Sequence, residues 1–181
     1  AKAAAKKPAA KKAPAVKKAA VKKAAAPKKA APAAKPAPVA PSGGSAPFKG
    51  SGTPSDPWVL KTPSLSSEYV MYRDPSLEPP ALVCKVGSTE LRYHLRAVED
   101  LHAMLKAHGD WIPLGSADEQ KPAADGTVEA WGRSAGNPVG GWYGLKKGLR
   151  GRFGMYVPPV LEALGLAEVE HNPRNNRMRA I

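Results

Sequence analysis

The sequence predicts an α+β fold class, with a disordered N-terminal tail followed by one small domain that holds an antiparallel sheet and helices and ends in a hairpin. Charge is the first observation: residues 1–47 contain 12 lysines and no Asp or Glu, whereas residues 48–181 contain 16 Lys and Arg against 15 Asp and Glu. All aromatic residues lie in the second segment. There, β-branched and aromatic runs bounded by Gly and Pro precede segments of helical periodicity, which favours sheet strands followed by helices.

The tail, residues 1–47, cannot build a core. It lacks aromatic residues, Leu, Ile and Met, so burial cannot offset the entropy of about 1–2 kcal/mol per ordered residue. Its lysine doublets recur every 5 or 6 residues, which places successive doublets on opposite sides of a helix and excludes an amphipathic membrane helix. A solvated, partly polyproline-II chain remains, whose lysines can contact phosphates and release counterions without a fixed register. The predicted nucleic-acid contacts of the tail are Lys6, Lys7, Lys11, Lys12, Lys17, Lys18, Lys22, Lys23, Lys28 and Lys29.

Two units of the tail are typical of basic chromatin segments: Pro-Ala-Ala-Lys-Lys-Ala-Pro at 8–14 and Ala-Val-Lys-Lys-Ala-Ala at 15–20. The tail thereby resembles the Lys/Ala/Pro-rich tails of linker histones and of bacterial histone-like nucleoid proteins. That resemblance implies DNA compaction or non-specific anchoring, with double-stranded DNA as the partner. RNA, a ribosome or an acidic surface as partner, and a tail that only solubilises, are the alternatives.

Residues 48–57 are rich in Gly, Pro and Ser and are expected to form a flexible linker before a domain at 58–181. Strands are predicted at 58–62, 68–73, 81–86 and 90–94, the last two joined by a turn at Gly87. A helix is predicted over 96–108, with Val98, Leu101, Met104, Leu105 and His108 on its apolar face and Gly109 at its end. A polar loop at 116–125 and a short helix capped by Thr127 follow.

The segment 142–156 combines an apolar stripe with basic residues. Its large apolar residues are spaced 3, 4, 4 and 3 apart, which predicts a helix with four glycines on the opposite side. No Asp or Glu lies between Glu129 and Glu162. The basic residues predicted to contact nucleic acid here are Lys146, Lys147, Arg150 and Arg152. The competing interpretation is a core helix packed through its glycines, with a solvated basic flank. The spacing of a phosphate-binding P-loop is not met.

The C-terminal end predicts a short helix from Pro158 that stops at Gly165, then strands at 166–172 and 176–181. This order resembles the recognition-helix-plus-wing end of winged-helix DNA-binding domains, within 127–181, so the hairpin is winged-helix-like. The matching residues are Leu161, Leu164, Gly165 and Leu166, then Arg174, Arg177 and Arg179. The resemblance implies a helix in the major groove and a wing, with Arg174 and Arg177, on the backbone or minor groove. Alternatively, Glu170 neutralises Arg177 or Arg179, depending on the strand register.

No catalytic residues, cofactor or metal site are expected. The four histidines lack the i, i+4 spacing of a helical zinc pair, and the single cysteine, Cys84, lies in an apolar run and is predicted to be a buried core residue. No apolar stretch is long enough to span a membrane and no secretory signal is visible, so no membrane partner is expected. The expected location is the cytoplasm, on the nucleoid, or the nucleus of a eukaryote.

These observations favour sequence-non-specific DNA binding by a nucleoid-associated or architectural protein, without enzymatic activity. Two alternatives stay open. One is an RNA- or ribosome-associated factor, and the other is a domain of different function that the tail anchors to DNA.

Overall fold

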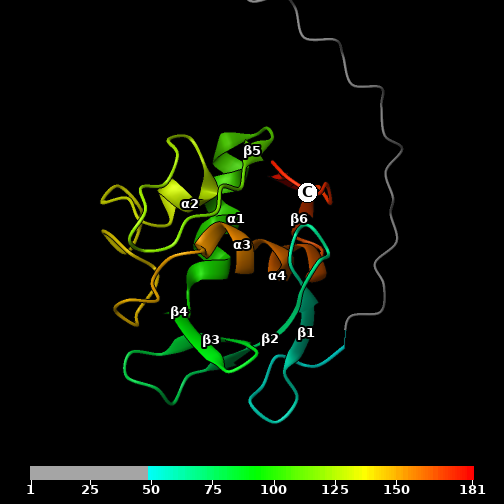
Figure 1. The fold of residues 1–181 in the computed structure, drawn as a ribbon, viewed down its shortest axis with the longest axis vertical. Coiled ribbons are helices and arrows are strands. Elements are labelled where there is room, and N and C mark those ends of the chain that lie inside the picture. Colours follow the sequence, from blue (N-terminus) through cyan, green and yellow to red (C-terminus); the bar gives the residue numbers. More distant parts are fainter. Residues whose placement is uncertain (1–48) are drawn as a thin grey trace, which may run out of the picture. The chain divides into compact units, whose positions relative to one another are not determined.

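Four strands form an antiparallel sheet in chain order: β1 (Trp58–Lys61), β2 (Glu68–Asp74), β3 (Ala81–Val86) and β4 (Thr89–His94). The structure, a computed structural model, describes residues 49–181 (Figure 1). Each strand follows its neighbour through a short connection, which sets registers such as Met71 opposite Cys84 and Cys84 opposite Leu91. The predicted strands and the α+β fold class are confirmed.

The rest of the same domain consists of α1 (Ala97–His108), β5 (Ile112–Pro113), α2 (Val128–Trp131), α3 (Phe153–Tyr156), α4 (Pro158–Ala163), β6 (Ala167–Val169) and β7 (Arg177–Ala180). The last strand, β7, lies between β5 and β6 in a three-stranded antiparallel sheet. Helices α3 and α4 cross the middle of the domain, with the four-stranded sheet on one side and the small sheet on the other (Figure 1).

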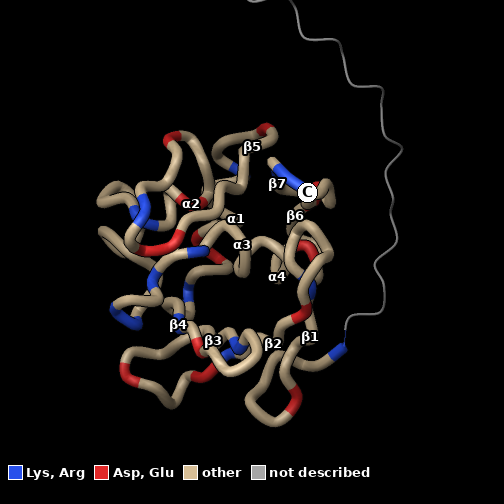
Figure 2. The backbone as a smooth tube through the Cα atoms, in the orientation of Figure 1, with Lys and Arg blue, Asp and Glu red and all other residues tan. Residues whose placement is uncertain are grey.

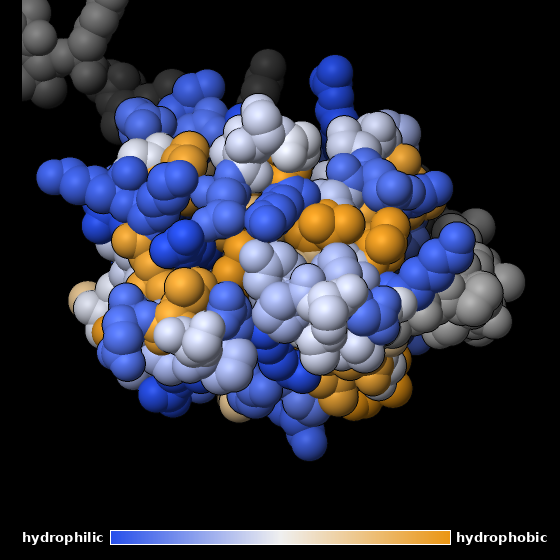
Figure 3. Space-filling view, turned by 90° about the horizontal axis from the view of Figure 1, so that it is seen from below, coloured by the Kyte–Doolittle hydropathy of each residue, from blue (hydrophilic) through white to orange (hydrophobic). Residues whose placement is uncertain are grey.

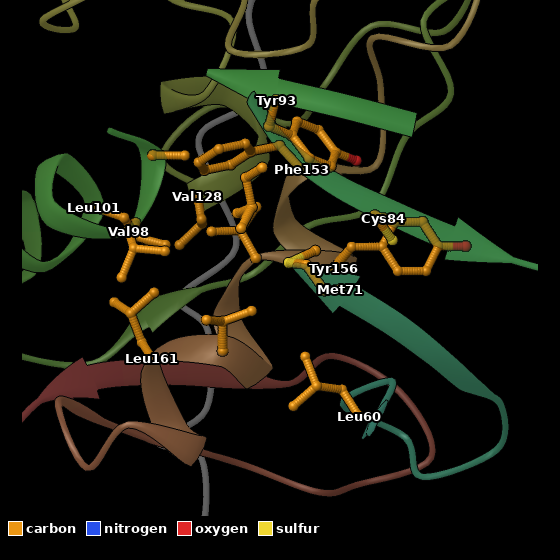
Figure 4. Close-up of a cluster of buried hydrophobic side chains, with 14 of the residues drawn as sticks. Leu60, Met71, Cys84, Tyr93, Val98, Leu101, Val128, Phe153, Tyr156 and Leu161 are labelled. Carbon is orange, nitrogen blue, oxygen red and sulfur yellow. The ribbon is translucent and has the colours of Figure 1, made fainter. Parts of the chain in front are cut away.

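One hydrophobic core joins the four-stranded sheet to the helices and to the small sheet. Leu60, Met71 and Cys84 of the four-stranded sheet are buried in one cluster with Phe153 and Leu161 of the short helices (Figure 4). Cys84 is fully buried, as predicted, and burial raises the pKa of its thiol. Two buried hydroxyls tie the sheet to the helical segments: Tyr69 donates to the carbonyl of Tyr156 at 2.7 Å, and Tyr93 to that of Gly151 at 3.1 Å.

Helix α1 follows its sequence pattern closely. Val98, Leu101 and Leu105 are buried, and the helix ends at Gly109, whose φ of +73° suits a residue without a Cβ. Its carboxylates Glu99 and Asp100 lie in the first turn, where the helix dipole favours negative charge. His108, expected on the apolar face, is exposed at the last turn instead.

The expected flexible linker is wrong for residues 49–57. Lys49 pairs with Val59 of β1, and the Asp56 carboxylate accepts the Ser51 amide at 2.8 Å. Gly52 lies directly against the Trp58 indole, where a Cβ would collide with the ring, and its carbonyl accepts the Arg73 amide. The missing side chains at Gly50 and Gly52, which predicted flexibility, here allow close packing.

The helix predicted over 142–156 is also wrong, because only its last four residues are helical as α3. Residues 142–152 form a loop whose start pairs with the edge of β4: the Leu145 amide donates to Arg92 and the Tyr143 carbonyl accepts from His94. Several glycines of a helix would each cost about 1 kcal/mol relative to Ala. In the loop they serve packing, since a Cβ at Gly151 would lie 2.6 Å from the Ala117 carbonyl oxygen.

We expect Gly151→Ala to destabilise the protein by about 1–3 kcal/mol, because the new methyl group has no space against the 117–119 backbone. Gly141→Ala is the matched control in the same glycine-rich region. Nothing lies within 4 Å of a Cβ at Gly141, so that change should leave stability unchanged or raise it by up to about 1 kcal/mol. Urea unfolding measures both, and equal effects of the two substitutions would contradict the packing role of Gly151.

Candidate nucleic-acid interface

The predicted interface divides into a part outside the described residues and a part within them. The ten tail lysines, and the whole of segment 1–47, lie outside the described residues. Within residues 49–181 the structure places Lys146, Lys147, Arg150 and Arg152 on one loop, and Arg174 and Arg177 near the C-terminal hairpin. The two groups lie in different parts of the domain, and in each group half of the basic residues are paired with a carboxylate of the same domain.

Arg150 and Arg152 are both bound to carboxylates of the polar loop 116–125. Arg150 binds Glu119 through Nε at 2.9 Å and Nη2 at 2.6 Å, while its backbone amide donates to the same carboxylate. Arg152 Nε donates to Asp118 Oδ1 at 2.5 Å. The hydrogen bond from Arg152 lowers the pKa of Asp118. Two of the four basic residues predicted on this loop are therefore locally neutralised.

A buried ion pair holds these two loops together. Glu129 of α2 is fully buried and binds Arg133 one turn later, and its second oxygen accepts the Gly154 amide at 2.7 Å. The Arg133 guanidinium also donates to the carbonyls of Ala117, Asp118 and Lys121. Burial raises the pKa of Glu129, while the bonds from Gly154 and Arg133 act in the opposite direction. Trp142 packs against both Arg133 and Arg150, with ring-to-guanidinium distances of 4.6 and 4.9 Å.

Lys146 and Lys147 are exposed, and neither makes an ion pair within residues 49–181. They follow the residues that pair with β4, so the sheet edge fixes their backbone. Lys146 borders a hollow of about 300 Å³ together with Arg92, Leu145 and Pro79. Of the basic residues predicted on this loop, the two lysines keep their charge available for a phosphate.

The C-terminal hairpin takes the salt-paired form that the sequence left open as an alternative. Glu170 pairs with Arg177 at 2.6 Å and Glu168 with Arg179 at 2.6 Å. Both arginines also lie over the Trp111 ring. Arg174, at the tip, is exposed and makes no ion pair in the described part of the chain.

Helix α4, the expected groove-reading helix, is buried along its first four residues. Its only charged side chain, Glu162, binds His171 at 2.8 Å. His171 also bonds through Nδ1 to the Pro63 carbonyl at 2.8 Å, which connects the hairpin to the loop after β1. This helix therefore has no exposed polar face with which to contact base edges.

Along the backbone of residues 49–181, Lys and Arg positions lie among Asp and Glu positions (Figure 2). On the face seen from below in Figure 1, apolar residues are scattered among hydrophilic ones (Figure 3). Among the described residues, no cluster of three His, Cys, Asp or Glu is arranged to hold a metal ion. The same part of the chain contains no helix long and apolar enough to cross a membrane.

We expect Arg133→Met to cost about 3–5 kcal/mol, because it leaves the Glu129 carboxylate buried without its cation and three loop carbonyls without donors. Arg92→Met is the control. It breaks the Arg92–Glu90 pair, whose Arg side chain is 44% exposed, and should change stability by less than about 1 kcal/mol. Denaturant unfolding of both variants measures the difference, and a mild effect of Arg133→Met would show that the loops do not depend on the pair.

Hydrogen bonds from Arg150 lower the pKa of Glu119 from 4.5 to about 2. A carboxyl with a lowered folded pKa stabilises the protein above its unfolded pKa, and this contribution is lost as pH falls toward about 2. Glu119→Gln should therefore reduce the loss of stability between about pH 5 and pH 2. Urea unfolding at a series of pH values tests this, and an NMR titration of Glu119 with a midpoint near 4.5 would contradict the ion pair.

The folded domain described above is also the part of the chain for which a comparison with known proteins found a match. Residues 50–181 match the model of a family of unknown function, DUF6855, while the lysine-rich segment 1–47 lies outside the match. No curated protein and no solved structure matches the chain. Because the matched region spans more than half of the sequence, the chain belongs to the family DUF6855.

Proposed function

We propose that this protein binds DNA without sequence preference, through the lysines of segment 1–47, as a nucleoid-associated or architectural protein with a binding role and no catalytic one. The observation that carries the proposal is the division of charge. The segment holds 12 lysines and no acid, whereas the rest of the chain is nearly neutral, with 16 basic and 15 acidic residues. Lysine is a point charge suited to phosphate contacts that carry no sequence information.

Pairing within the folded domain supports this division. Five arginines, namely Arg133, Arg150, Arg152, Arg177 and Arg179, are bound to carboxylates of the same domain. An arginine held in such a pair must break it before it can neutralise a phosphate. The domain's own contribution to DNA binding then rests on Lys146 and Lys147, with Arg174 at the hairpin tip as a further contact.

The same pairing favours one second candidate function, a domain of separate activity that the tail holds on DNA. In that case the lysine-rich segment supplies all of the affinity for DNA, and the family domain acts on another partner. An RNA partner remains the alternative for the tail, because phosphate contacts do not by themselves distinguish the two nucleic acids.

The test uses the full-length chain and a labelled mixed-sequence duplex, with fluorescence anisotropy at several salt concentrations. Replacing the ten doublet lysines between Lys6 and Lys29 by Gln preserves chain length and removes the charge. Each phosphate contact contributes a salt slope of about −0.9, so engagement of half of these lysines predicts a loss of about 4–5 in the slope. Unchanged affinity and slope in this variant would refute tail-mediated binding.

A second variant, Lys146→Gln/Lys147→Gln, measures the share of the folded domain. It should reduce the magnitude of the slope by at most about 2, because it removes two phosphate contacts. No change in this variant, together with a large loss in the tail variant, would favour the anchored domain of separate activity. A single-stranded RNA of the same length, titrated in parallel, tests the choice of nucleic acid, and tighter binding to the RNA would assign the tail to RNA.

A further inference from the structure

A cleft of about 390 Å³ opens between the β3–β4 hairpin and the loops at 118–120 and 148–152. Its apolar lining comes from Val86, Leu91, Leu149 and Tyr156. Its polar lining includes Asp118 and Arg152. A cleft of this volume, with apolar and polar groups in its lining, falls within the size range of sites for small organic ligands.

The polar wall presents an acceptor and a donor side by side. Arg152 Nε donates to Asp118 Oδ1 at 2.5 Å, and the two side chains are 44% and 41% exposed. Asp118 Oδ2 has no hydrogen-bond partner within residues 49–181. A ligand in the cleft can therefore reach a carboxylate oxygen and a guanidinium group without first separating the pair.

The backbone fixes this wall in place. Arg152 has a φ of +61°, a conformation that is uncommon for a residue with a side chain, and its amide donates to the Ala117 carbonyl at 2.9 Å. The carbonyls of Ala117 and Asp118 are in turn held by the buried Arg133. Strained residues that the surrounding structure holds in place are frequent at binding sites, where they position a side chain in advance.

We propose that the cleft binds a guanine base. Guanine carries two adjacent N–H donors, at N1 and N2. One can donate to the free Oδ2 of Asp118, and the other to Oδ1, which accepts from Arg152 and can accept a second hydrogen bond. Next to these donors lie the O6 and N7 acceptors, the groups that Arg most often contacts on guanine. The base lies against the apolar part of the lining, which Val86 and Leu149 expose most, since Tyr156 is only 5% exposed. Adenine lacks the N1–H donor and the O6 acceptor, so it leaves Asp118 and Arg152 incompletely paired.

This inference goes beyond the proposed function, because lysine contacts with phosphates cannot distinguish one base from another. The base has two possible sources with the same chemistry, a free guanine nucleotide or an unpaired guanine in a single strand. A guanine within a duplex has its N1–H and N2–H groups in base pairs, so the duplex does not offer the required edge.

The first experiment is isothermal titration calorimetry of the full-length chain with GMP, IMP and AMP. IMP keeps the N1–H and O6 groups but lacks the N2 amine, so the expected order of affinity is GMP, then IMP, then AMP. AMP should bind at least about tenfold more weakly than GMP, since a site built for hydrogen bonds rejects an analogue that lacks them. No saturable binding of GMP, or equal affinity for GMP and AMP, would overturn the proposal.

Variants assign the binding to the cleft. Asp118→Asn removes the carboxylate, and Arg152→Gly removes the guanidinium while giving the φ of +61° to a residue that adopts it without strain. Each should weaken GMP binding by at least about tenfold. Glu168→Gln is the control, because it breaks a comparably exposed Arg–carboxylate pair on the small sheet. Unaltered GMP affinity in both cleft variants would overturn the proposal.

Thr89→Trp tests the cleft without touching its polar wall. Thr89 is exposed and lines the cleft from the hairpin side, so an indole there should fill the space and abolish GMP binding while β4 tolerates the aromatic residue. Retained binding in this variant would place the ligand elsewhere and overturn the proposal.

A titration with single-stranded DNA distinguishes the two sources of the base, a free guanine nucleotide and an unpaired guanine in a strand. The full chain is titrated with an oligo(dA) strand that carries one central dG or none, and the tail contributes equally to both. Tighter binding of the dG strand assigns the site to unpaired bases, whereas GMP binding without this difference assigns it to the free nucleotide. A failure of GMP to bind leaves the salt-dependent binding of duplex DNA intact, so the two proposals fail separately.

Discussion

The fold beyond the four-stranded sheet depends on the buried pair of Glu129 and Arg133. Residues 114–157 contain little regular structure, so their backbone groups need partners that helices and strands do not supply. The pair meets that need: Arg133 satisfies three carbonyls of the 117–121 segment and Glu129 satisfies the Gly154 amide. Burying an ion pair costs free energy in isolation, and here that cost is offset by the hydrogen bonds that the pair makes to two separate segments.

The charge pattern of the domain follows from this arrangement. With the 117–121 loop fixed by Arg133, Asp118 and Glu119 are held next to the loop that carries Arg152 and Arg150. This pairing neutralises Arg150 and Arg152 where the domain's sequence is most basic, and leaves Lys146 and Lys147 as the basic residues of that loop without an ion pair in the described part of the chain. Most of the chain's net positive charge lies in residues 1–47, whereas the cleft lies in the folded domain. Under the two proposals made above, non-specific attachment and selective recognition belong to different parts of the chain and can be tuned independently.

Sequence patterns predicted features that depend on neighbouring residues, and missed contacts between residues that lie far apart in the sequence. The four strands, the helix ended by Gly109, the cap at Thr127 and the stop at Gly165 follow from short-range chemistry, and the structure contains all of them. The strand β5 has two residues, one of them a proline, and offers no periodic signal. The apolar spacing of 142–156 suggested a helix, but its glycines pack against other loops. The partners of Arg150 and Arg152 lie 31 and 34 residues earlier in the chain, a distance at which charge counting gives no pairing.

The glycines of the 140–154 region differ in which residues could take their place, because their surroundings and backbone dihedral angles differ. At Gly151 the neighbouring backbone occupies the place of a Cβ, so no other residue substitutes without moving the loop. At Gly148 the surroundings are open and only the φ of +88° matters, so asparagine or aspartate can serve there. Substitution is therefore limited at Gly151 by the neighbouring backbone atoms and at Gly148 by the backbone dihedral angle. Insertions are better accommodated near Gly148 than near Gly151, because Gly148 has open surroundings.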